Sequence, residues 1–153
     1  MNFTVSGLSP GPFLPLYGLS EAELAKRRAR RVTAGAAGFP ERIELRDAEP
    51  GETLLLVNFE HQPADTPFRA SHAVYVREGA TESRSFAGLP YALSRRLLSL
   101  RGFSADGMMV EADVVEGSDC EPVIERLLGD PRIDYIHAHS ARPGCYLARI
   151  DRA

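Results

Sequence analysis

Apolar runs that alternate with polar segments predict strands along most of the chain. Residues 2–5 and 42–45 alternate weakly between apolar and polar side chains, as half-buried strands do. Residues 53–60 form a continuous apolar run that turns polar at its end, which is typical of a buried strand that emerges into a site. The pattern resumes at residues 70–77 after a proline-containing loop at 63–67, so the two strands are predicted to form a hairpin.

A second hairpin is predicted near the C-terminus, after a further strand at residues 108–115. Residues 133–139 and 145–151 are separated by a turn that contains Pro143 and Gly144. Proline at the second and glycine at the third position of a four-residue turn is the type II signature. The two flanking strands are therefore expected to be antiparallel.

Three segments have apolar residues at helical spacing. The predicted helices run from Ser20 to about Arg31, from Pro90 to Leu100, and from Ser118 or Asp119 to Gly129. Ser20 and Glu23 form a capping box, because the hydroxyl can accept a hydrogen bond from the Glu23 amide while the carboxylate reaches back. This box marks the start of the first helix.

The order of these elements predicts the fold class. About seven strands are mixed with about three helices, without regular alternation of one strand and one helix. This order favours an α+β fold with a mainly antiparallel mixed sheet and helices on one side. A chain of 153 residues, 44% of them hydrophobic, has the usual size of one compact domain, so we expect a single domain over residues 1–153.

Composition and charge exclude several classes of function. No stretch approaches the roughly 20 apolar residues that span a bilayer, and the N-terminus lacks the pattern of a signal peptide. We therefore expect a cytoplasmic protein without a membrane partner. Cys120 and Cys145 lie at unrelated spacing outside any CxxC motif, which predicts reduced thiols.

Nucleic acid is not expected as a partner. The net charge is −3, and the 18 basic residues are distributed along most of the chain. The exception is a run of basic residues at 26–31, and such a cluster of positive charge can bind the phosphates of a nucleic acid. Acidic Glu21 and Glu23 precede this run, so it is interpreted instead as the solvated end of a helix whose charges complement the helix dipole.

The four histidines fall in two pairs, each at the mouth of a predicted hairpin. Side chains alternate along a strand, so Tyr135, His137 and His139 share one face. Two imidazoles side by side can bind one divalent metal ion such as zinc. A third ligand would come from His61, His72, Glu60 or Cys145. The alternative is that His137 and His139 only form hydrogen bonds across the sheet.

Cys145 is a candidate nucleophile. It directly follows the predicted turn and lies across the hairpin from the region of His139. An adjacent imidazole lowers the pKa of a thiol, and Arg142 would add positive charge. The competing interpretation is that Cys145 is a small buried hydrophobic residue. Cys120, at a helix start without a histidine nearby in the sequence, is expected to be inert.

Polar residues also gather at the first hairpin. The strand end places Asn58, Glu60 and His61 opposite Arg69, Ser71 and His72. Successive side chains of a strand point to opposite faces, so His61 and Glu60 lie on different faces of the predicted strand. These groups converge only if the strand is bulged or ends by His61. Glu60 or His61 would then act as a base, with Arg69 as a clamp for an anionic substrate. The alternative is an ordinary solvated strand end.

The sequence resembles a bacterial family catalogued as domain of unknown function 1203. The resemblance covers nearly the whole chain and is carried by residues 58–63 (Asn-Phe-Glu-His-Gln-Pro), 69–79 (Arg-Ala-Ser-His-Ala-Val-Tyr-Val-Arg-Glu-Gly), 136–139 (Ile-His-Ala-His) and 142–146 (Arg-Pro-Gly-Cys-Tyr). It implies a small single-domain bacterial protein. The family supplies no reaction, cofactor or catalytic residue, so function rests on the residues themselves.

Two classes of function follow from these patterns. The first is a small enzyme or small-ligand-binding protein whose pocket is formed by the two hairpin mouths. Its polar lining would be His61, His72, His137, His139 and Cys145, with Arg69 and Arg142 as anion contacts and Asn58 and Ser71 beside them. The alternative is a non-catalytic interaction or assembly module, a homo-oligomer that uses an exposed sheet edge or the basic helix end.

Overall fold

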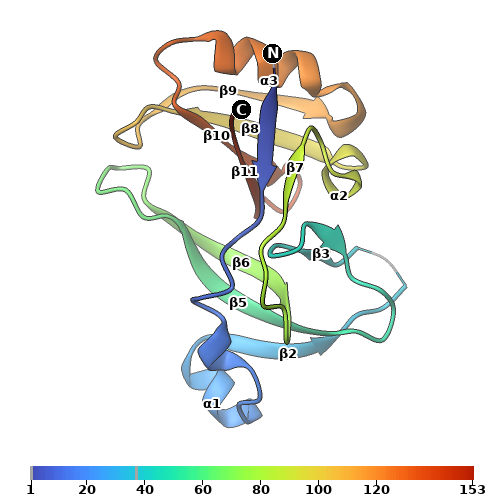
Figure 1. Ribbon diagram of the computed structural model, residues 1–153. Coiled ribbons are helices and arrows are strands. Elements are labelled where there is room, and N and C mark those ends of the chain that lie inside the picture. The colour runs from blue at the N-terminus through green and yellow to red at the C-terminus, as the bar shows by residue number, and fades with distance from the viewer. Residues whose placement is uncertain (1, 37) are drawn as a thin grey trace.

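The computed structural model describes residues 2–36 and 38–153, whose strands form two sheets (Figure 1). The first sheet has the order β7–β1–β11–β10–β8–β9, formed by Ser85–Ala87, Phe3–Ser6, Tyr146–Arg152, Tyr135–Ser140, Leu97–Phe103 and Met109–Glu116. The second has the order β2–β5–β6–β3–β4, formed by Ala29–Thr33, Thr53–Gln62, Ala70–Arg77, Pro40–Glu41 and Arg46–Asp47. All pairs are antiparallel except β3 with β6.

The helices are short and lie outside the sheets. They are α1 (Glu21–Lys26), α2 (Tyr91–Ser94) and α3 (Glu121–Gly129), with 3-10 turns η1 (Leu14–Leu16) and η2 (Gly117–Asp119). The expected α+β class is confirmed, with the strands divided between two sheets rather than collected in one. No helix in the described ranges is long and apolar enough to cross a membrane.

Each sheet buries a core against its own helix. Helix α3 covers the face of the six-stranded sheet that points away from the five-stranded sheet (Figure 1). The core between them contains Leu98, Leu100, Ile124, Leu127, Leu128, Ile136, Ala138 and Ile150. A second core joins α1 and η1 to the five-stranded sheet and contains Phe13, Leu16, Leu24, Leu55, Val57, Val74 and Val76. Because Ile136 and Ala138 face α3, strand alternation turns Tyr135, His137 and His139 toward the other sheet.

The first predicted helix is shorter than expected. Ser20 does cap α1, since its hydroxyl accepts a hydrogen bond from the Glu23 amide at 3.2 Å. The helix nevertheless ends at Lys26, because Arg28 adopts a φ of +55° and turns the chain. Residues 29–33 then form β2 against β5, which puts Arg30 and Arg31 of the basic run on a strand and corrects the prediction of a helix to Arg31.

The segment 42–45 is a turn and not the expected strand. It connects β3 and β4, and Leu45 adopts a φ of +53° within it. The carboxylate of Glu41 accepts hydrogen bonds from the amides of Ile43 and Glu44 at 2.8 and 2.6 Å. This local satisfaction of backbone donors by a side chain competes with strand pairing.

The helix predicted from Pro90 to Leu100 is mostly a strand. Helix α2 includes only Tyr91–Ser94, and residues 97–103 form β8. Leu98 and Leu100 are fully buried two positions apart, so their spacing has the period of a strand. A short run of leucines is compatible with the period of a helix and with that of a strand. Residues 97–103 form a strand because they pair with β10 on one side and β9 on the other.

The remaining predictions are close to the structure. Both hairpins form, as β5 with β6 and β10 with β11, and Gly144 has the positive φ of +82° that its place in the turn requires. Helix α3 begins one or two residues later than expected. Its N-cap is Cys120, whereas Ser118 and Asp119 belong to η2.

Candidate metal centre

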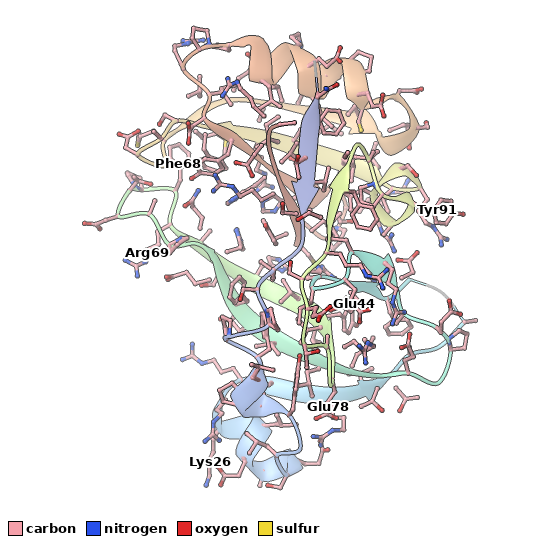
Figure 2. The ribbon with its side chains drawn as sticks, in the orientation of Figure 1. Lys26, Glu44, Phe68, Arg69, Glu78 and Tyr91 are labelled. Atoms are coloured by element: carbon pink, nitrogen blue, oxygen red, sulfur yellow. The ribbon has the colours of Figure 1, made fainter. Side chains whose placement is uncertain are left out.

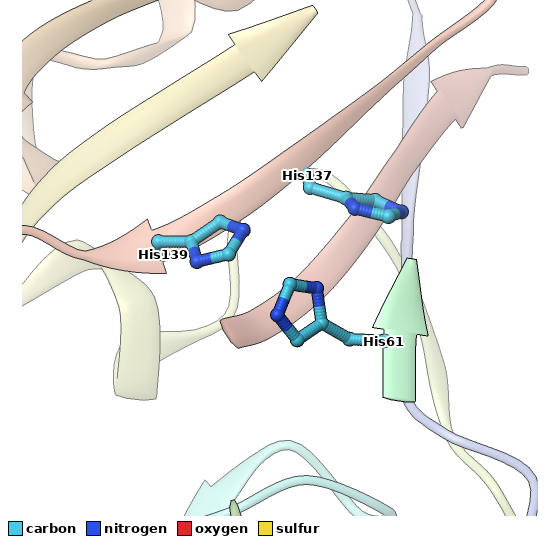
Figure 3. A group of neighbouring side chains, drawn as sticks. All are labelled: His61, His137 and His139. Atoms are coloured by element: carbon cyan, nitrogen blue, oxygen red, sulfur yellow. The ribbon is translucent and has the colours of Figure 1, made fainter. Parts of the chain in front are cut away.

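His61 owes its position to a bulge at the end of β5. In the pairing with β6, Phe59 lies opposite His72 and Glu60 opposite Ser71, but the next pair is Gln62 with Ala70. His61 is therefore the extra residue of a β-bulge, which breaks the alternation that would otherwise set its direction. The bulge allows His61 to face strand β10 of the other sheet (Figure 3).

Three histidines meet between the two sheets. His61 comes from β5, while His137 and His139 come from the same face of β10 (Figure 3). One ring nitrogen of each lies within 4.8 Å of one ring nitrogen of both others. The ring centroid of His61 lies 5.0 Å from that of His139 and 6.2 Å from that of His137. Two segments 76 residues apart in the sequence, by the difference between positions 61 and 137, thus build one cluster.

Burial keeps all three imidazoles neutral. Desolvation, with a smaller contribution from nearby Arg101, lowers the pKa of His61 to about 4. Desolvation likewise lowers the pKa values of His137 and His139 to about 3, and neighbouring rings and arginines add to this effect. A neutral imidazole has a lone pair for a metal ion, whereas an imidazolium has none. The cluster is therefore in the metal-binding protonation state at neutral pH.

The hydrogen bonds of the three rings leave nitrogen lone pairs available. The Nδ1 atom of His139 donates to the carbonyl oxygen of Gly144 at 2.9 Å, which places the free lone pair of that ring on Nε2. The Nδ1 atoms of His61 and His137 are buried and have no hydrogen-bond partner among the described residues. Buried polar atoms without partners are rare and are often explained by an ion or a water molecule.

Aromatic rings hold the imidazoles in place. The ring of Tyr146 stacks on His61 with centroids 5.3 Å apart and an interplanar angle of 11°. It also meets the edges of His137 and His139 at 5.1 and 5.8 Å. Phe103 packs on His137 at 5.1 Å. These contacts restrict ring rotation and exclude water from one side of the cluster.

A polar hollow of about 380 Å³ adjoins the cluster and includes His61 and His137 in its wall. The Gln62 side-chain amide donates to the Tyr135 hydroxyl across it at 2.9 Å, which links the two sheets. The Arg149 guanidinium lies over the Tyr135 ring, 4.1 Å from its centroid. A molecule in this hollow would therefore meet two imidazoles and a cation.

His72 and Cys145 do not belong to the cluster. The Nδ1 atom of His72 accepts a hydrogen bond from the Ala73 amide at 2.9 Å, and this residue is not one of the three that converge. Cys145 is half-buried and makes no hydrogen bond with a histidine in residues 2–36 or 38–153. His139 bonds instead to the carbonyl of Gly144. The thiol of Cys145 thus has no imidazole partner in the structure, and its role as a nucleophile stays a prediction. Cys120 is fully buried, and desolvation raises its pKa to about 11.

The other candidates of the first hairpin lie on its surface. Glu60 pairs with Arg69 at 3.0 Å, and both side chains are exposed. Arg69 lies at the end of the first hairpin (Figure 2). A guanidinium already paired with a carboxylate is a poor clamp for a substrate anion. Asn58 and Ser71 are exposed as well. The alternative of a solvated strand end therefore describes these four residues, while His61 alone joins the cluster.

Arg142 and the basic run also lie away from the histidines. Arg142 is exposed on the turn between β10 and β11. Within the basic run, Glu23 pairs with Lys26 and Arg27, and Arg31 pairs with Glu21 and Glu78. These ion pairs neutralise much of the charge that a nucleic acid would contact.

Sequence reasoning overlooked the residues that surround the histidines. Tyr146 and Phe103 contact the rings, and Arg101 and Arg149 lower their pKa values. The position of Tyr135 could be predicted from the sequence, because strand alternation puts it on the same face of β10 as His137 and His139. The other four residues lie near the histidines because of how the strands pair and the sheets pack, which no short stretch of sequence indicates.

The comparisons with known proteins identify a family but no activity. Residues 38–152 match a family model described as "Protein of unknown function (DUF1203)". No curated protein and no solved structure matches the sequence.

Proposed function

The chain belongs to the DUF1203 family, and from this premise we propose that the protein is a metal-dependent enzyme or small-ligand binder whose metal ion is held by His61, His137 and His139. The observation that carries the proposal is the convergence of three neutral imidazoles with nitrogens within 4.8 Å of one another. A cytoplasmic location and a small-molecule ligand are parts of the same proposal.

The donor set fits a divalent transition metal, zinc in the first place. A zinc–nitrogen bond of about 2.0–2.1 Å and tetrahedral angles place two bound nitrogens roughly 3.3 Å apart. The nitrogens lie within 4.8 Å of one another, so binding requires them to approach by at most about 1.5 Å. The hydrogen bond from His139 to Gly144 is of the kind that orients metal-bound histidines.

Three protein ligands favour a centre of the open type. Structural zinc sites usually have four protein ligands, whereas catalytic sites have three and leave a position for water or substrate. No fourth histidine, cysteine or acidic residue of the described chain joins the three. A bound divalent ion would supply a Lewis acid and, by lowering the pKa of a bound water molecule, a nucleophile at neutral pH.

The hollow beside His61 and His137 is the proposed ligand site. Arg149 adds positive charge to the wall, but its guanidinium makes three hydrogen bonds to Asp151, so it is not assigned as a clamp for an anion. The Tyr135 hydroxyl and the Gln62 amide would orient polar groups of the ligand. The alternative of an interaction or assembly module stays a prediction, which measurement of the mass in solution by light scattering would test.

Zinc titration of the untagged, chelator-treated protein tests the proposal. We expect one zinc ion per chain for the wild type and for His72→Gln, the matched control, because His72 lies outside the cluster. The variants His61→Gln, His137→Gln and His139→Gln should each bind zinc about 100-fold more weakly or not at all, since each loses one of three ligands. Circular dichroism establishes that each variant is folded.

The spectrum of the cobalt-loaded protein gives a second readout. Cobalt bound by three imidazoles should show the intense visible absorption of a four- or five-coordinate site, which should change when a small anion is added. Wild-type protein that binds no zinc, or cluster variants that bind as tightly as the wild type, would contradict the proposal.

A further inference from the structure

A second hollow lies between the sheets, away from the histidines, and a buried arginine faces it. Its volume is about 400 Å³. Leu56 and Tyr75 line it from β5 and β6, and Cys145 lines it from the residue just before β11. Arg42 and Arg96 also belong to its lining. The wall is mainly apolar apart from the two arginines, which is typical of sites for small organic molecules.

Arg42 is buried without a carboxylate partner. Its exposed fraction is 2%. The Nε atom donates to the carbonyl oxygen of Tyr146 at 2.8 Å, and Nη1 donates to that of Pro40. Among residues 2–36 and 38–153, the hydrogen bonds of the guanidinium are these two, both to backbone carbonyls, and none goes to a carboxylate. An isolated buried cation is costly, which favours binding of an anion.

The neighbouring groups compensate the charge of Arg42 only in part: Cys145 and Glu41 favour the charged guanidinium, but burial outweighs them. Arg96 also lines the hollow, and it is already paired with Asp47 at 2.7 Å. Glu41 adjoins Arg42 in the sequence, but its carboxylate accepts the amides of Ile43, Glu44 and Arg77. Burial lowers the pKa of Arg42 to about 10, so the guanidinium still carries its charge at neutral pH. The hollow therefore contains a positive charge that makes no ion pair with a carboxylate of the described residues.

We propose that this hollow binds a small organic carboxylate, with the carboxylate on the Arg42 guanidinium and an apolar body against Leu56 and Tyr75. Arg42 supplies donors in the planar arrangement that matches a carboxylate. The apolar wall excludes a highly charged ligand such as a nucleotide. This site is separate from the histidine cluster, and neither proposal depends on the other.

Protection of Cys145 from iodoacetamide tests the proposal without any substitution. Octanoate is the probe, octanol is its neutral counterpart, and a chelator is present so that no metal at the histidines takes up the carboxylate. We expect saturable protection by octanoate, with alkylation of Cys145 slowed about tenfold or more at saturation, and much weaker protection by octanol. Cys120 serves as the internal control, because it is fully buried and should not react in the folded protein.

Two variants probe the two ends of the hollow. Arg42→Met removes the charge and should weaken octanoate about tenfold or more, since a charge-assisted hydrogen bond is lost. If this variant does not fold, Ala73→Phe provides the same test, because Ala73 lines the hollow and a larger side chain would occupy it. Equal protection by octanol and octanoate, equal protection by inorganic phosphate, or undiminished octanoate binding in both folded variants would overturn the proposal.

Discussion

Gly107 shows how one residue supports the histidine cluster from outside it. It lies in the loop between β8 and β9 with a φ of +86°, and a Cβ atom there would overlap that of Ala64. The Thr66 hydroxyl donates to the carbonyl oxygen of Gly107 at 3.1 Å. The loop that follows His61 and Gln62 is thus packed directly on the β8–β9 loop, which fixes one wall of the hollow beside the cluster.

We expect Gly107→Ala to destabilise the protein more than Gly51→Ala. Both glycines have a positive φ, but nothing lies within 4 Å of a Cβ atom at Gly51. The backbone penalty of about 1 kcal/mol is therefore common to both variants, and the overlap with Ala64 adds about 1–3 kcal/mol for Gly107→Ala alone. Urea unfolding measures this difference. Zinc affinity should fall only in Gly107→Ala, and equal behaviour of the two variants would refute the role of this contact.

At the scale of elements, the same residue types start a helix in one place and not in another. Ser20 caps α1, and Glu23 directs its carboxylate to Lys26 and Arg27 rather than back to the cap. Ser118 has the composition of a cap but belongs to η2, and Cys120 occupies the N-cap position of α3 without a side-chain hydrogen bond. A cap is therefore decided by backbone geometry as well as by residue type.

Paired serine substitutions separate these two situations. Ser20→Ala should cost about 1 kcal/mol of unfolding free energy, because the amide of Glu23 loses its acceptor at a helix of only six residues. Ser118→Ala should change the stability by less than about 0.5 kcal/mol, since Ser118 is exposed and caps nothing. Denaturant midpoints give both values. A loss for Ser118→Ala as large as that for Ser20→Ala would show that our assignment of the caps is wrong.

At the scale of the whole molecule, the two sheets are joined by a few polar contacts and by the histidines. Gln62 reaches Tyr135, Arg42 reaches the backbone of Tyr146, and Asp47 of β4 pairs with Arg96 at 2.7 Å next to β8. The histidine cluster draws one ligand from the five-stranded sheet and two from the six-stranded sheet. A metal ion bound by all three would therefore cross-link the sheets.

Zinc should consequently raise the melting temperature of the protein. A ligand at about 100 times its dissociation constant adds about 2.7 kcal/mol to the unfolding free energy, because it binds only the folded state. Addition of a chelator should reverse the shift. His72→Gln should respond as the wild type does, whereas His61→Gln, which removes the ligand from the five-stranded sheet, should not respond. A shift of equal size in His61→Gln would show that zinc stabilises the protein at another place.

The local pattern of residues was sufficient to predict the two hairpins, the fold class and the placement of His137 and His139 side by side. The alternation that puts His137 and His139 on one face of a strand, the glycine of the β10–β11 turn and the cap at Ser20 are all properties of adjacent residues, and each is present. Such features depend on backbone conformation within a few residues, which the side chains of those residues control.

The rest was decided by contacts between distant segments. Leu98 and Leu100 became strand residues because β10 and β9 pair on either side of them, although their spacing also allows a helix. The bulge at His61 depends on how β5 pairs with β6. The meeting of β5 with β10 and the enclosure of Arg42 depend on how the two sheets pack against each other. The spacing of residues along a strand determines which side chains share a face of that strand. Which of these faces contact one another is determined only by the packing of the two sheets.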